Sequence, residues 1–132
     1  MAKHLGEFEQ LVLFALVHLG EEAYGLAIRR DIEKRAGRAV SQGAVYMTLN
    51  RLADRGYVTA HSEQPADGNG GRPRKLYRLE PAGARTLRRA YDQMSAMADG
   101  ALETLGDIAD GRGPRSRASS GAVRTGSEAK AG

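Results

Sequence analysis

The stretch of residues 41–57 reads SQGAVYMTLNRLADRGY and constrains the fold more than any other part of the chain. Ser41 is a favourable N-cap residue, because its hydroxyl can accept a hydrogen bond from an amide of the first helical turn. Gly56 suits a left-handed stop at the other end. Three aliphatic residues between them lie at helical spacing: Val45, Leu49 and Leu52. The stretch therefore predicts one amphipathic helix with a defined start and end.

The opposite face of this predicted helix is polar and cationic, and its only carboxylate, Asp54, lies near the end. A face of this kind fits the major groove of DNA. The same apolar period also occurs in any amphipathic helix of a small domain, so the helix alone leaves both interpretations open. The residues on this face are Gln42, Tyr46, Met47, Asn50 and Arg51.

Two further helices are predicted before this one. Residues 5–20 are apolar nearly all round, which indicates burial on more than one side, and Gly20 ends the segment. Residues 24–37 form a second amphipathic segment that ends at Gly37, and a link of three residues connects it to Ser41. A short link between two helices of this kind is the helix-turn-helix pattern.

A β-hairpin is predicted after the polar helix. Residues 57–61 and 75–79 are rich in strand-forming side chains, and residues 62–74 between them contain several glycines and prolines. The second half of this hairpin carries Arg72, Arg74 and Lys75, which could reach phosphate or a narrow minor groove. The pattern predicts a basic wing, although a basic surface loop would look the same.

Positive charge is concentrated in the predicted reading segment. The 132-residue chain has a net charge of +4, but residues 24–78 alone hold eleven Lys and Arg against five Asp and Glu. Clustered positive charge is what neutralisation of phosphates requires. A solvated surface also carries charge, so this feature supports DNA binding without establishing it.

The C-terminal part predicts one long helix and a tail. Pro81 suits a first helical turn, and apolar residues from Leu87 to Ile108 follow a heptad pattern, with Gly100 as a point where the helix could bend. Such a seam meets either its own domain or another subunit, and its length favours another subunit. We therefore expect a DNA-binding domain at 1–80, a dimerisation helix at 81–110 and a disordered basic tail at 111–132.

Several classes of function are disfavoured by the sequence. The chain has no cysteine, its three histidines are scattered, and it contains no HExxH, GxSxG or nucleotide-binding glycine motif. We expect no enzyme activity, no cofactor and no metal. The longest apolar run, residues 11–17, is too short to cross a membrane, and no signal peptide is visible, so a cytoplasmic location is expected.

The chain resembles the PadR family of bacterial transcriptional regulators over about residues 5–105. The resemblance is carried by Leu11 to Leu19 with Tyr24-Gly25, by Gly56-Tyr57-Val58, by the SxGAVYxxLxRL pattern from Ser41, and by GRPRKLYRLxPxG from Gly71. Met47 stands where the family usually has proline, so the contacts of that turn can differ. The chain looks like the short branch of the family, with a single helix after the wing.

This resemblance implies a mainly α fold with a small β wing, a winged helix-turn-helix followed by a long dimerisation helix. It also implies a homodimer, in which the last helix packs on the first helix of the partner and the third helix of each subunit enters the major groove of an operator. Family members are mostly repressors, and several respond to small aromatic or hydrophobic compounds bound at the dimer interface.

The candidate residues fall into two groups. Those expected to contact double-stranded DNA are Tyr24, Ser41, Gln42, Gly43, Tyr46, Met47, Arg51, Arg72, Arg74 and Lys75. Those expected at the dimer and effector interface are Leu11, Phe14, Leu87, Tyr91, Met94, Met97 and Leu105. The alternative function is a winged-helix adaptor that docks a protein and has no sequence-specific DNA binding.

Overall fold

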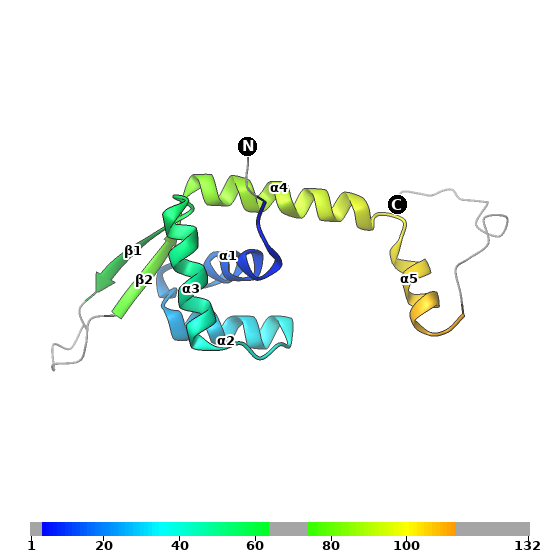
Figure 1. The fold of residues 1–132 in the computed structure, drawn as a ribbon, viewed down its shortest axis with the longest axis horizontal. Coiled ribbons are helices and arrows are strands. Elements are labelled where there is room, and N and C mark those ends of the chain that lie inside the picture. Colours follow the sequence, from blue (N-terminus) through cyan, green and yellow to red (C-terminus); the bar gives the residue numbers. More distant parts are fainter. Residues whose placement is uncertain (1–3, 64–73, 113–132) are drawn as a thin grey trace. The chain divides into compact units, whose positions relative to one another are not determined.

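The computed structural model describes residues 4–63 and 74–112. The chain divides into two compact units, Met1–Ala90 and Tyr91–Gly132, and α4 contributes residues to both. The elements, shown in Figure 1, are α1 (Glu7–Leu19), the short 3-10 helix η1 (Gly20–Glu22), α2 (Gly25–Ala36), α3 (Gln42–Asp54), β1 (Val58–Glu63), β2 (Arg74–Leu79), α4 (Pro81–Ala98) and α5 (Leu102–Ala109). The fold is thus mainly helical with a small antiparallel sheet, as the sequence predicts.

The core of the first unit lies among α1, α2 and α3, which pack against one another in all three pairs. Each helix contributes the apolar residues that recur at helical spacing, so the three inner stripes meet. The side chains with no exposed surface include Val12, Leu13, Ile28, Val45, Leu49 and Leu52. The inner face predicted for the segment from Ser41 is therefore confirmed.

The ends of the helices follow from local chemistry. The Ser41 hydroxyl accepts a hydrogen bond from the Ala44 N–H at 3.0 Å, which confirms it as the N-cap of α3. Gly37 and Gly56 adopt the left-handed conformation, with φ of 65° and 79°. Residues with a β-carbon rarely adopt that backbone conformation, so glycine at these two positions allows the chain to turn after α2 and after α3.

The two strands pair in antiparallel register, from Val58 opposite Leu79 to Glu63 opposite Arg74. On its other edge β2 touches the chain before α2, because the Tyr77 N–H donates to the Ala23 carbonyl at 2.9 Å. Both Leu76 and Tyr77 are buried, although successive side chains of a strand point to opposite faces. The wing is therefore fixed to the start of α2.

The single helix predicted for residues 81–110 is wrong, because the structure has two. α4 ends at Ala98 and α5 begins at Leu102, and Gly100 between them has φ of 77°. A residue in this conformation interrupts helical hydrogen bonding, and glycine adopts it without steric cost. The boundary between the compact units also lies within α4 and not before it. The predicted tail lies outside the described residues from 113 onward.

Candidate nucleic-acid interface

The start of α3 presents an open surface. Ser41 and Gly43 are exposed, and no heavy atom outside the helix would lie within 4 Å of a β-carbon on Gly43. One turn later Met47 is 63% exposed and Tyr46 is 39% exposed. The backbone and side chains of the first two turns of α3 are thus open enough for this part of the helix to enter the major groove of DNA.

Tyr46 is nevertheless anchored on one side. Its ring lies so close to Gly25, the first residue of α2, that a β-carbon at position 25 would collide with the phenol oxygen and two ring carbons. Gly25 is buried for this reason. The contact joins the first residue of α2 to the second turn of α3.

Two polar groups near this junction have no hydrogen-bond partner among the described residues. They are the amide nitrogen Nε2 of Gln42 and the hydroxyl of Tyr77. Burial, and to a smaller degree the neighbouring Tyr46, raises the pKa of Tyr77 above its ordinary value. The Gln42 donor lies inside the surface, so it reads a base edge only in another rotamer.

The wing meets α2 through a stacked pair. The guanidinium of Arg74 lies 4.6 Å from the centre of the Tyr24 ring, within the range of a cation–π contact. Lys75 and Arg78 on the same strand are exposed and form no ion pair within the described part of the chain. Arg72 belongs to residues 64–73, which lie outside the described residues.

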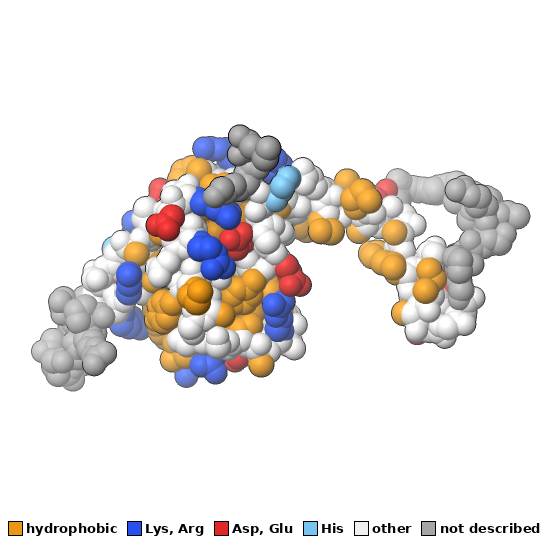
Figure 2. All heavy atoms as spheres, in the orientation of Figure 1, with side chains coloured by type: hydrophobic (Ala, Val, Ile, Leu, Met, Phe, Trp, Pro, Cys, Tyr) orange, Lys and Arg blue, Asp and Glu red, His pale blue; other side chains and the backbone are white. Residues whose placement is uncertain are grey.

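Much of the positive charge counted from the sequence is compensated inside the first unit. Figure 2 shows Lys and Arg side chains close to Asp and Glu side chains on this face. Two pairs follow helical i, i+4 spacing and could be read from the sequence, whereas those made by Glu7 and Glu9 join residues far apart in it. The pairs are Arg29–Glu33, Arg35–Asp31, Arg38–Glu7, Arg51–Glu9 and Arg55–Glu9.

Glu33 also fastens the turn between α2 and α3, a role that sequence reasoning missed. Its carboxylate accepts a hydrogen bond from the Val40 N–H at 3.2 Å and from Arg29 at 3.4 Å. The Val40 amide first, and then Arg29, lower the pKa of Glu33 despite some desolvation. Because Val40 directly precedes the N-cap Ser41, this contact helps to place the start of α3.

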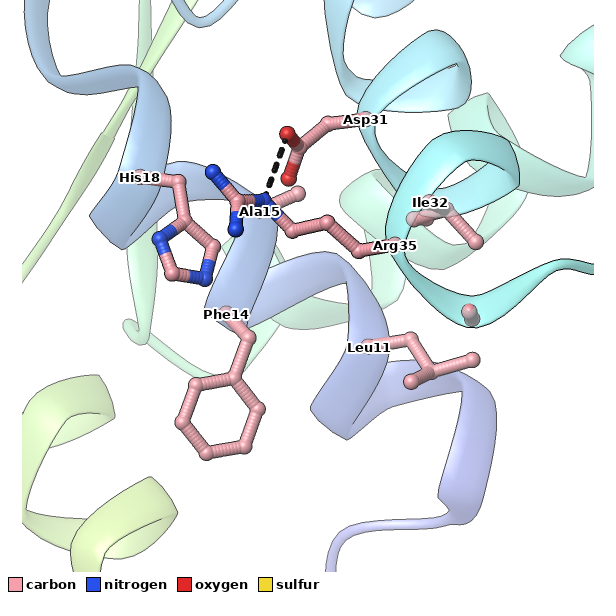
Figure 3. Close-up of a pocket in the computed structure, with 8 residues that line it drawn as sticks. Leu11, Phe14, Ala15, His18, Asp31, Ile32 and Arg35 are labelled. Carbon is pink, nitrogen blue, oxygen red and sulfur yellow. Dashed lines mark hydrogen bonds and ion pairs between the residues drawn. The ribbon is translucent and has the colours of Figure 1, made fainter.

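Two of the expected interface residues line a cavity between α1 and α2. The cavity has a volume of about 270 Å³, and Leu11 and Phe14 form part of its apolar wall. Figure 3 shows His18 of α1 together with the Asp31–Arg35 ion pair of α2, which is 2.9 Å long, among the lining residues. The remaining lining residues are Ala15, Ile32 and Ala36. This cavity could hold an apolar group with a polar end.

The expected residues of the C-terminal part divide into two kinds. Leu87 is expected at the dimer interface, but it is 4% exposed and packs in the hydrophobic core of the first unit. In the second unit Tyr91, Met94, Met97 and Leu105 are 53–78% exposed. Figure 2 shows hydrophobic side chains along the last turns of α4 and on α5.

The described residues contain no cluster of metal ligands. No group of three or more His, Asp or Glu side chains among them could hold a metal ion. Within the same residues, no helix combines the length and the apolar character that crossing a membrane requires.

A comparison with protein families finds one match. The profile described as the transcriptional regulator PadR-like family matches residues 13–89, which include α2, α3, both strands and the start of α4. No curated protein matches the chain.

Solved structures with the same fold include several regulators. A PadR family transcriptional regulator from Eggerthella lenta is 27% identical, with a TM-score of 0.57, 75% of this chain covered and 86% of that one. A PadR family regulator from Clostridium difficile is 16% identical, with a TM-score of 0.61 and coverage of 74% and 98%. Bacillus subtilis PadR in complex with operator DNA is 20% identical, with a TM-score of 0.53 and coverage of 63% and 46%.

Proposed function

The chain belongs to the PadR-like family of transcriptional regulators, and from this premise we propose that it is a dimeric repressor of transcription. Each subunit would place α3 in the major groove of an operator and its wing on the adjacent backbone. A small hydrophobic or aromatic effector would release the DNA. It would act in the cytoplasm.

One continuous set of contacts carries the proposal. Tyr46 of α3 packs on Gly25 at the start of α2, the preceding residue Tyr24 stacks on Arg74, and Lys75 follows on the same strand. The recognition helix, the start of α2 and the wing are therefore joined at one corner of the first unit. An exposed helix start beside Lys75, which has no ion pair within the described residues, is suited to phosphate and base contacts.

The full set of proposed DNA contacts keeps Ser41, Gly43 and Met47 on the exposed start of α3, and Gln42 after a change of rotamer. Arg51 remains in the set, although Glu9 holds it in the free protein. Arg72 is proposed from its place in the predicted wing. A relative of the same fold, Bacillus subtilis PadR, is in complex with operator DNA, which supports this choice of partner.

Exposed apolar side chains support a dimer. Val17 on α1 is 55% exposed, and in the second unit Leu102 and Ile108 join the exposed residues named above, at 66% and 50%. Exposed apolar side chains of this number are a typical mark of a protein interface. A second copy of the chain would cover them, and an effector bound among them would favour one dimer geometry over another.

The experiment that tests the proposal has two parts. Duplexes that the full-length protein retains from a random DNA pool should converge on one pseudo-palindromic sequence, and the mass of the protein in solution should be that of a dimer. If the selection enriches no sequence and the protein retains no duplex at low salt, the result would favour the protein-docking adaptor instead. A monomeric mass alone would remove the dimer and leave DNA binding in place.

A further inference from the structure

Glu9 is a buried acid that joins α1 to the recognition helix. Its side chain is only 10% exposed. One oxygen, Oε1, accepts the Gly6 N–H at 2.8 Å and lies 3.4 Å from Nη1 of Arg55, while Oε2 lies 3.7 Å from Nε of Arg51. One carboxylate therefore caps α1 and faces two guanidinium groups of the last turns of α3.

The two arginines differ in how far they can leave this acid. Arg55 is 22% exposed and lies over the Tyr57 ring, so its stem is largely enclosed. Arg51 is 53% exposed, follows the exposed Asn50, and donates from Nη2 to the Thr48 hydroxyl at 3.2 Å. Arg51 thus borders the outer face of α3 while its charge is directed inward.

A carboxylate offers a guanidinium the same kind of charged acceptor as a DNA phosphate does. An arginine held by Glu9 can bind phosphate only after exchanging one acceptor for the other. The exchange also leaves a buried carboxylate with fewer partners, which costs free energy. Lys75 and Arg78 pay no such cost, since neither forms an ion pair within the described residues.

We propose that Glu9 is a specificity-determining residue that competes with DNA phosphate for Arg51, while Arg55 stays with the acid. On non-specific DNA Arg51 stays with Glu9 and adds little to the attraction between the protein and the DNA phosphates. On the operator, where α3 is fully seated, Arg51 exchanges Glu9 for DNA. This inference rests on the proposed DNA-binding function and predicts that the charge of Glu9 lowers non-specific affinity.

The test measures how the logarithm of affinity falls with the logarithm of salt concentration. It uses a duplex selected by the native protein and a scrambled duplex of equal length and composition. Glu9→Gln keeps the size of the side chain and an oxygen that can accept the Gly6 N–H at the start of α1, but it removes the charge. On the scrambled duplex we expect tighter binding and a slope steeper by about 0.9 for each arginine that reaches a phosphate. The ratio of selected to scrambled affinity should fall.

The matched control is Glu22→Gln, which removes the same charge from an exposed residue of η1 that has no ion pair in the described part of the chain. It should leave both slopes close to native. If Glu9→Gln gives native slopes and a native affinity ratio, Glu9 is only a structural link and the inference is overturned.

A second variant decides the question even if Glu9→Gln fails to fold. Arg51→Gln should flatten the slope on the selected duplex by about 0.9 and leave it unchanged on the scrambled duplex. Equal flattening on both duplexes would mean that Arg51 already binds non-specific DNA, and flattening on neither would mean that no exchange occurs. If the native protein binds no duplex at all, the proposed function fails, which is a different outcome.

Discussion

The ring of Tyr46 in α3 lies directly over Gly25, the first residue of α2, and leaves no room there for a side chain. Tyr24, one residue earlier, stacks on Arg74 of the wing at 4.6 Å. Two adjacent residues therefore connect α3 with the hairpin. The glycine serves here through its small size, because it lets an aromatic ring reach the backbone of the neighbouring helix.

Gly25→Ala should destabilise the native protein by about 1–3 kcal/mol, the range for an extra methyl group in a packed site. In a Tyr46→Ala background the same change should cost little, since the colliding ring is gone and alanine is the better helix former. Urea unfolding of the four proteins gives this double-mutant cycle. Additive effects would show that Tyr46 does not rest on Gly25 in solution.

The elements that depend on local chemistry could be predicted from the sequence. Ser41 caps α3, Gly37 and Gly56 end their helices, and the two strands form the expected hairpin. In these cases the deciding contacts lie within a few residues of one another. Short-range signals of this kind are the most dependable in a single sequence.

Features that depend on contacts between distant segments could not be predicted. Glu9 looks like a surface acid until α3 brings two arginines to it. Tyr77 looks like one side of an alternating strand until the chain at Ala23 covers its second edge. The spacing of Leu87 fits a heptad seam, but its side chain packs in the hydrophobic core of the first unit. A bend of the C-terminal helix at Gly100 is expected from the sequence, whereas the complete interruption between α4 and α5 depends on the positive φ of this residue.

Tyr77→Phe should make the protein more stable, by about 1 kcal/mol, because it removes a buried hydroxyl that has no partner among the described residues. It should also reduce the loss of stability at high pH. The pKa of Tyr77 is raised in the folded protein, so the unfolded chain releases this proton first as pH rises.

The stabilising contribution of protonated Tyr77 is therefore complete below its ordinary pKa of 10.0 and is lost as pH rises from there through the higher folded pKa. Thermal melting across this alkaline range measures the effect. Tyr91→Phe, which removes an exposed phenol from the second unit, is the control and should keep the native alkaline loss. Identical pH profiles for native protein and Tyr77→Phe would contradict the assignment.

Gly83→Ala should destabilise the first unit by about 1–3 kcal/mol. A β-carbon at this position in α4 would collide with the Tyr57 carbonyl oxygen and lie 2.9 Å from Cδ1 of Leu79. Backbone at Tyr57 cannot swing aside as a side chain can, and it also accepts the Glu80 N–H at 2.9 Å. Equilibrium unfolding in urea measures the change in free energy.

The matched control for this prediction is Gly43→Ala, which is also a change within a helix but has open space around it. It should stabilise the fold by up to about 1 kcal/mol through better helix propensity. Similar effects at the two positions would show that helix propensity, and not the contact with Tyr57, sets the result.

Lys75→Gln should weaken binding to every duplex and flatten the salt dependence by about 0.9, the effect of losing one phosphate contact. Lys75 is exposed and has no ion pair within the described residues, so it can reach the backbone without first leaving an acid of its own chain. Arg85→Gln removes the same charge from an exposed position on α4, where no ion pair holds it among the described residues, and it should keep the native slope. Affinity measured for selected and scrambled duplexes over a salt series separates the two variants. An equal, small loss in both would mean that overall charge, and not the wing, governs attraction to DNA.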